Sequence, residues 1–117
     1  MKEWKPATVE YVKQLVERGL FDCDEEQLAV FKTFAVQPYN APIMRYGNEE
    51  IVVVIARNGN EVIYFEDVED GFNVSPTDSN GEILEHWCNQ DDLKFALDYW
   101  IEGRGGTEKV GPAQPID

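Results

Sequence analysis

Two β-rich runs joined by Asn58-Gly59 are the feature that most restricts the fold of this chain. The runs cover residues 50–57 and 61–68, and Asn-Gly between such runs favours the positive φ angles of a tight hairpin turn. Residues 51–55 read Ile-Val-Val-Val-Ile, and a β-branched run of this kind is typical of a strand that is covered on both faces. The sequence therefore predicts a sheet with this hairpin at its centre.

Three shorter β-rich runs predict further strands, at residues 43–46, 72–75 and 82–87. Residues 37–42 read Gln-Pro-Tyr-Asn-Ala-Pro. Proline fixes its own φ angle, lacks an amide donor and disfavours helix in the residue before it. Pro38 is therefore expected to stop the preceding helix, and residues 37–42 are expected to form an extended loop.

Apolar residues at steps of three and four predict two helices before the sheet. Thr8 is placed to cap the first helix, over residues 8–18, and Gly19 is placed to end it. The second helix is expected to start at Asp24, whose carboxylate can cap the helix while Gln27 bonds back to the cap residue. Its apolar stripe consists of Leu28, Phe31, Phe34 and Ala35.

A third helix is expected after the sheet, with Asn89 as its cap and Gly103 as its left-handed exit. Its apolar stripe consists of Leu93, Ala96, Leu97, Trp100 and Ile101. Because a stripe of this width needs cover, the helix is expected to close the core, with Trp100 and Phe72 as core residues.

These elements predict an α+β fold in which two N-terminal helices precede an antiparallel meander of four to five strands, and a C-terminal helix packs on the sheet. A chain of 117 residues has the size of one domain. Residues 1–103 are expected to form that domain, and residues 104–117, which contain glycine and proline, are expected to form a flexible tail.

The charge balance disfavours several classes of partner. The chain has 23 acidic and 10 basic side chains, for a net charge of −13. Nucleic acids and anionic membranes attract basic surfaces, so binding to either is not expected. The longest apolar run, residues 51–56, falls far short of the roughly 20 residues that a membrane-spanning helix needs. No secretory signal is recognised, and a cytoplasmic location is the prediction.

Catalytic chemistry finds little support in the sequence. His86 is the only histidine, and histidine is the usual proton-transfer residue near neutral pH. His86 and Cys88 would share one face of a strand, as a base and a thiolate can, but no acyl-transfer motif surrounds Cys88. Adding Cys23 does not produce the spacing of a metal site. No catalytic residue, metal or cofactor is therefore predicted, and the cysteines are expected to be reduced thiols.

Two alternatives to a simple binding surface stay open. Tyr39 and Tyr46 lie on either side of Pro42. Together with His86 and Cys88 they are candidate residues of a pocket for a small molecule or a substrate. The other alternative is a homodimer built on an exposed strand edge or an apolar helix face.

Acidic side chains concentrate in residues 66–102, which we call the acidic segment. It holds 11 acidic side chains and Lys94 as its single basic one, so it carries −10 of the net −13. Such a surface steers basic partners, and aromatic side chains surrounded by charge are typical of protein-binding hot spots. The candidate partner-binding residues are Glu66, Asp67, Glu69, Asp70, Glu85, Trp87, Asp91, Asp92 and Tyr99.

The chain resembles the small acidic α+β immunity proteins of bacterial toxin systems, and the small orphan proteins carried on mobile gene cassettes. The likeness rests on size, the helical start, the central runs 50–57 and 61–68, and the sequence Glu-Asp-Val-Glu-Asp-Gly-Phe at residues 66–72. It implies a protein without catalytic activity that binds a cognate toxin, often a basic nuclease, through acidic and aromatic side chains. The sequence therefore predicts a non-enzymatic, acidic protein-binding module that binds a basic protein.

Overall fold

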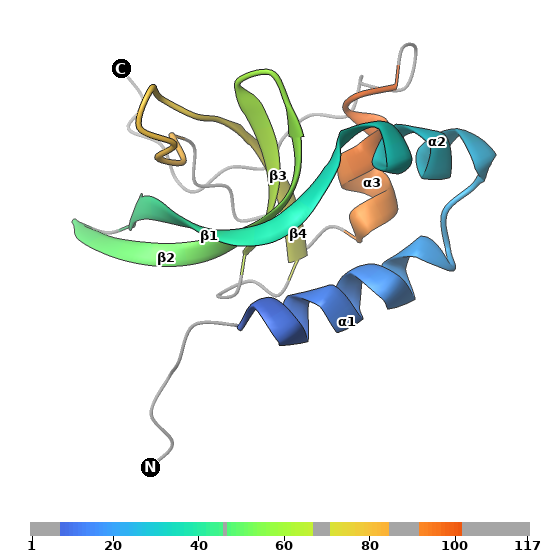
Figure 1. Cartoon of the computed structure of the whole chain (residues 1–117), viewed down its shortest axis with the longest axis horizontal. Helices are drawn as coiled ribbons and strands as arrows, with labels where there is room; N and C mark the ends of the chain where they lie inside the picture. Colours follow the sequence, from blue (N-terminus) through green and yellow to red (C-terminus); the bar gives the residue numbers. More distant parts are fainter. Residues whose placement is uncertain (1–7, 46, 67–70, 85–91, 102–117) are drawn as a thin grey trace, which may run out of the picture.

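The computed structural model describes residues 8–45, 47–66, 71–84 and 92–101. Its elements follow the order α1 (Val9–Leu20), α2 (Glu25–Phe34), β1 (Ala35–Arg45), β2 (Asn48–Asn58), β3 (Glu61–Glu66), β4 (Gly71–Pro76) and α3 (Leu93–Asp98). The strands form one antiparallel sheet in the order β1-β2-β3-β4, and the helices pack on one face of it (Figure 1). The predicted α+β meander with a C-terminal helix on the sheet is confirmed.

The β2–β3 hairpin forms where the sequence predicts it. Asn58 pairs with Glu61, and Gly59 adopts a φ of +63°, which residues with a β-carbon rarely adopt. On β2 the five residues 52–56 are buried, as expected for a central strand. Ile51 differs and is exposed, because β2 pairs with β3 only from Val53 onward and its first residues extend past that neighbour.

The face of the sheet under the helices contains the larger apolar cluster, which we call the helix-face core. Alternate residues of the strands point to it, as the twofold period of a strand requires. Its buried members are Val53, Ile55, Ala56, Ile63, Phe65, Phe72 and Val74 from the sheet, Val12 and Val16 from α1, and Leu93, Ala96 and Leu97 from α3. Phe72 is a core residue, as predicted.

The opposite face has its own apolar cluster, made of Ala41, Ile43, Val52, Val54, Val62, Tyr64 and Ile83. Ile83 lies beyond β4 and forms isolated bridges with Thr77 and with Ile43 of β1. Its amide donates to the Pro42 carbonyl at 2.8 Å. The segment after β4 therefore returns across the sheet to the far edge strand, as Figure 1 shows, and covers the face that the helices leave open. Of the predicted strand 82–87 the structure describes only residues 82–84, and these form no strand.

The prediction of a loop at residues 37–42 was wrong, because these residues belong to β1. In an antiparallel ladder the N–H and C=O of one residue point to the same side. The Pro42 carbonyl accepts from Ile83, so Pro42 turns its backbone away from β2 and its missing N–H costs no ladder bond. Helix α2 also ends at Phe34, and Ala35, expected in its apolar stripe, begins β1 opposite Ala56.

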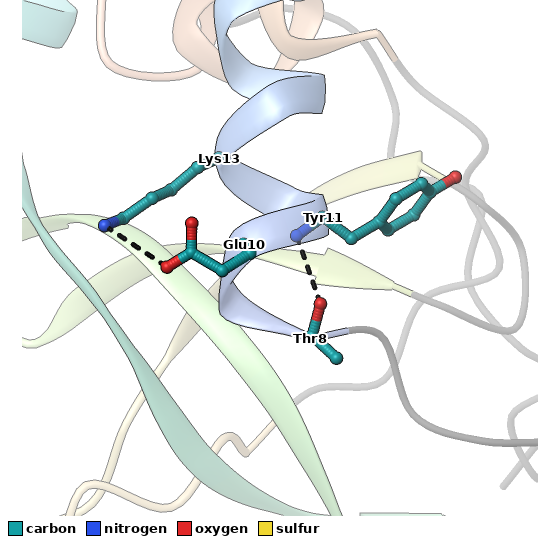
Figure 2. A network of polar contacts seen from close by, with 4 residues as sticks. All are labelled: Thr8, Glu10, Tyr11 and Lys13. Carbon is teal, nitrogen blue, oxygen red and sulfur yellow. Dashed lines mark hydrogen bonds and ion pairs between the residues drawn. The ribbon is translucent and has the colours of Figure 1, made fainter.

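The helix starts follow the sequence closely. The Tyr11 amide donates to Thr8 Oγ1 at 3.1 Å at the start of α1 (Figure 2). At α2, Asp24 and Gln27 each accept a hydrogen bond from the other's amide at 2.8 Å, which is the expected capping box. Helix α3 begins at Leu93, and its expected cap Asn89 lies outside the described residues. In the described part of the chain, no helix combines the length and apolar character that crossing a membrane requires.

Gly19 does not end α1, which continues to Leu20. A β-carbon placed on residue 19 would lie 3.0 Å from the Leu93 β-carbon. The glycine is thus required where α1 meets the start of α3, and the prediction that it terminates the helix was wrong.

We expect Gly19→Val to lower the free energy of unfolding by about 1–3 kcal/mol, because the added methyl groups force α1 away from Leu93. Gln14→Val, at an exposed position of the same helix, is the matched control and should cost less than ~0.7 kcal/mol. Urea denaturation measures both values. Equal stability of the two variants would show that α1 and α3 do not pack closely at residue 19.

Candidate protein-binding surface

The structure describes three of the nine candidate partner-binding residues: Glu66, Asp92 and Tyr99. The other six, which are Asp67, Glu69, Asp70, Glu85, Trp87 and Asp91, lie outside the described residues. Of the candidate pocket residues, only Tyr39 is described, and Tyr46, His86 and Cys88 lie outside. Tyr39 is half-buried and packs against the cluster on the open face of the sheet.

Glu66 is fully buried, so its expected place on an acidic surface was wrong. It is the last residue of β3 and pairs with Gly71 across the turn to β4. Its side chain follows the strand alternation of Val62 and Tyr64 and enters the interior with them. From the sequence Glu66 was a candidate residue of a binding surface, whereas its position in β3 decides its burial.

Asp92 and Tyr99 flank α3 in different environments. Asp92 is exposed, and its side chain makes no capping hydrogen bond to the helix. Tyr99 is half-buried and packs against the helix-face core. Trp100, expected in the core, is also half-buried there, and its indole N–H donates to Glu61 Oε1 at 2.9 Å. Its ring meets Phe34 edge-on, with 5.5 Å between centroids.

The most exposed large apolar side chain in the described part of the chain lies between α1 and α2. Phe21 is 89% exposed. The residues that follow it are Asp22, Cys23, Asp24, Glu25 and Glu26, and we call residues 21–26 the acidic corner. The sequence analysis missed this surface, although an aromatic residue outside the helix stripe and directly before four carboxylates in five residues was a readable signal.

Backbone hydrogen bonds set the geometry of the acidic corner. The amides of Phe21, Asp22 and Cys23 donate to the last carbonyls of α1 at 3.1–3.2 Å. Asp24 then starts α2 at once through its capping box. Because the reversal between the helices is this short, the Phe21 ring has no core to enter and remains in solvent.

The acidic corner adjoins the acidic segment. Gln27 of α2 is buried, and its side-chain amide donates to Asp98 Oδ1 of α3 at 2.9 Å and to the Lys94 carbonyl at 3.3 Å. Together with Arg18, Asp22 and Asp92 also line one cavity of about 210 Å³ between α1, the start of α3 and the adjacent ends of β3 and β4. Exposed carboxylates from both regions therefore share one side of the molecule.

The negative field of the acidic corner acts on Cys23. Its pKa is raised above the ordinary value, first by burial and then by Asp24, Asp22 and Asp98, while Lys94 acts in the opposite direction. The thiol donates to the Gly19 carbonyl at 3.5 Å. Cys23 is thus a protonated thiol at neutral pH, and a thiolate is disfavoured at this position.

Two adjoining cavities, of about 290 and 540 Å³, lie along α1 and α2, and together they form what we call the α1–α2 groove. Leu20 and Phe31 line both. The first cavity is also lined by Lys13, Val16, Glu17, Ala35, Val36, Pro38 and Ile55. The second is also lined by Glu25, Leu28, Ala29 and Lys32. Tyr39 lines neither of these cavities nor the one between Asp22 and Asp92.

Comparison with protein-family models, with curated proteins and with solved structures finds no match to this chain. Within residues 8–45, 47–66, 71–84 and 92–101, no three histidine, cysteine, aspartate or glutamate side chains converge as metal ligands.

We expect Glu66→Lys to lower the free energy of unfolding by more than about 3 kcal/mol, because it puts an ammonium group in place of a fully buried side chain. Glu49→Lys makes the same charge change at an exposed strand position and should stay within ~0.5 kcal/mol of the wild type. Chemical denaturation compares them. If both variants were equally stable, Glu66 would lie on the surface after all.

In a Cys88→Ser background, alkylation of Cys23 by iodoacetamide should reach half its maximal rate at a higher pH than in the urea-unfolded chain. The reason is that burial and the neighbouring carboxylates raise the pKa of the Cys23 thiol, so the reactive thiolate forms only at higher pH. Asp22→Asn should move that midpoint downward, since it removes one of the charges. A folded-state midpoint at or below the unfolded one would contradict the described environment.

Proposed function

We propose that this chain is a non-enzymatic protein-binding module that docks a basic protein on the acidic corner. The observation that carries the proposal is Phe21, an aromatic side chain 89% exposed and directly followed by Asp22, Asp24, Glu25 and Glu26. The Phe21 ring contributes little to the core and is available to a partner, where its burial would be favourable. Aromatic anchors within a charged surround are the usual anatomy of a binding hot spot.

Long-range electrostatics supports the same class of partner. With a net charge of −13, the chain attracts basic proteins and repels acidic ones over distances of about one Debye length, roughly 8 Å at physiological salt. Carboxylates of α3 and of the acidic corner lie on one side, where Asp98 contacts α2 through Gln27. A basic partner approaching that side meets the steering field and the exposed ring together.

A basic toxin is the specific partner that we propose, with this chain as its immunity protein. Support comes from the resemblance in size, acidity and element order, and from the kind of surface that blocks a basic active site. The homodimer is disfavoured as the main function because two copies of a chain with a net charge of −13 repel each other.

The test compares two double variants with equal charge change. Asp22→Lys/Glu25→Lys alters the acidic corner, and Glu49→Lys/Glu82→Lys alters exposed or partly exposed carboxylates away from α1 and α2. Each protein is immobilised and exposed to its source lysate at low and high salt, and the association rate of the retained protein is then measured. We expect the association rate of the corner variant to be about tenfold lower and to depend less on salt. The control variant should keep most of the wild-type association rate and of its salt dependence.

A second pair of variants isolates the aromatic anchor. Phe21→Ala should raise the dissociation rate of the same partner at unchanged stability, whereas Leu84→Ala, at another exposed apolar residue, should leave it unchanged. Equal reductions of the association rate in both double variants would show that net charge attracts the partner and that the acidic corner has no special role. Retention of no basic protein by the wild type would contradict the proposed function.

A further inference from the structure

We propose that the α1–α2 groove is the seat of an amphipathic, basic helix of the partner. This inference rests on the proposed function and adds the mode of binding. It places the apolar side of the partner helix in the groove beside the acidic corner, so that its basic side chains meet the carboxylates there.

Helix α2 is the reason that the groove is apolar. Its sequence predicts a core-facing stripe of Leu28, Phe31 and Phe34, yet its one buried residue is Gln27. Leu28 is 38% exposed, and Phe31 and Phe34 are half-buried. An amphipathic helix normally buries its apolar stripe, so α2 retains apolar surface that residues 8–45, 47–66, 71–84 and 92–101 do not cover.

The groove is deep enough to accept side chains. Ile55, a fully buried residue of β2, lies at one of its walls, and Leu20 and Phe31 continue from the first cavity into the second. The cavities, of about 290 and 540 Å³, share these two residues and have room for several apolar side chains, such as those at i, i+3, i+4 and i+7 of a helix.

The chemistry of the groove selects a helix over an extended strand. Helical segments supply most of its walls, and the backbone N–H and C=O groups of a helix interior are already paired within the helix. An occupant must therefore satisfy its own backbone hydrogen bonds, which a helix does and an extended peptide does not. Where the edge strand β1 lines the groove, Pro38 offers no N–H, which disfavours strand addition there.

Charge complementarity selects a basic helix. Residues 8–34, which contain both helices, hold six acidic and three basic side chains. Two lysines, Lys13 and Lys32, line the groove, and Lys13 Nζ lies 3.9 Å from Glu10 Oε1 (Figure 2). Glu17 and Glu25 line the groove, and the acidic corner lies at its end. Lysine or arginine on the flanks of a docked helix would meet these carboxylates, whereas a second acidic copy of this chain would be repelled.

A model peptide tests the inference on the full chain. The probe is a fluorescently labelled peptide of about 14 residues, or four helical turns, with leucine at i, i+3, i+4 and i+7 and lysine elsewhere. Its control has the same composition in an order that gives no apolar face. Anisotropy titration should give a dissociation constant at least tenfold lower for the amphipathic peptide, and circular dichroism should show added helicity in its complex.

Variants of the groove locate the binding site. Leu28→Glu and Ala29→Glu change partly exposed groove positions of α2, and Leu84→Glu makes the same change at an exposed leucine outside the groove. Thermal melts confirm that each variant folds. We expect both groove variants to weaken peptide binding about tenfold or more, and Leu84→Glu to keep the wild-type affinity within about twofold.

Three results would overturn the inference: equal binding of the two peptides, unchanged affinity in both groove variants, or dimerisation of the wild type that Leu28→Glu abolishes. The first two would leave the proposed function standing, provided that Asp22→Lys/Glu25→Lys still slows association of a basic protein. If that double variant has no effect while the groove variants do, the groove binds helices and the acidic corner is not the docking surface.

Discussion

The structure depends on the need to cover both faces of the β2–β3 hairpin. Residues 52–56 of β2 and 62–66 of β3 are buried throughout, so neither strand can face water on one side. The helices cover one face, and the segment that carries Ile83 covers the other by bridging Thr77 and Ile43. Each fully buried aliphatic side chain in such a layer contributes about 1.5–3 kcal/mol, so this double burial dominates the stability of the fold.

The three helices contribute unequally to that cover, and the inequality connects the fold to function. Helices α1 and α3 bury Val12, Val16, Leu93, Ala96 and Leu97 in the helix-face core. They approach each other closely because residue 19 is glycine. Helix α2 instead contacts the core with half-buried residues and leaves Leu28 toward solvent, and Phe21, between α1 and α2, is also exposed. The side of the molecule that contributes least to the core is therefore the side with an exposed ring, an apolar groove and a cluster of carboxylates.

Features set by local interactions could be predicted from the sequence, and features set by tertiary position could not. The Asn58-Gly59 turn and the Asp24–Gln27 capping box involve residues within three positions of each other, so their sequence signals are sufficient. The prolines of β1 are typical of loop residues in a sequence. Pro42 fits a strand only because β1 is an edge strand and the Pro42 carbonyl points away from β2, toward Ile83, so that no ladder bond needs a proline N–H. Glu66 and Phe21 depart in opposite directions from the rule that acids lie outside and aromatics inside, since strand register buries one and a short helix reversal exposes the other.

The central claim is that the helical pair α1–α2 is the partner-facing side of the molecule. Amide chemical shifts of the ¹⁵N-labelled chain, followed while the amphipathic lysine–leucine peptide is added, test it most directly. The account predicts that the largest shifts fall between Lys13 and Lys32 and at Ala35 and Val36, with small shifts along β1 from Tyr39 onward and around Asp78. Shifts of equal size over the whole acidic surface, or largest shifts on the face covered by Ile83, would contradict it.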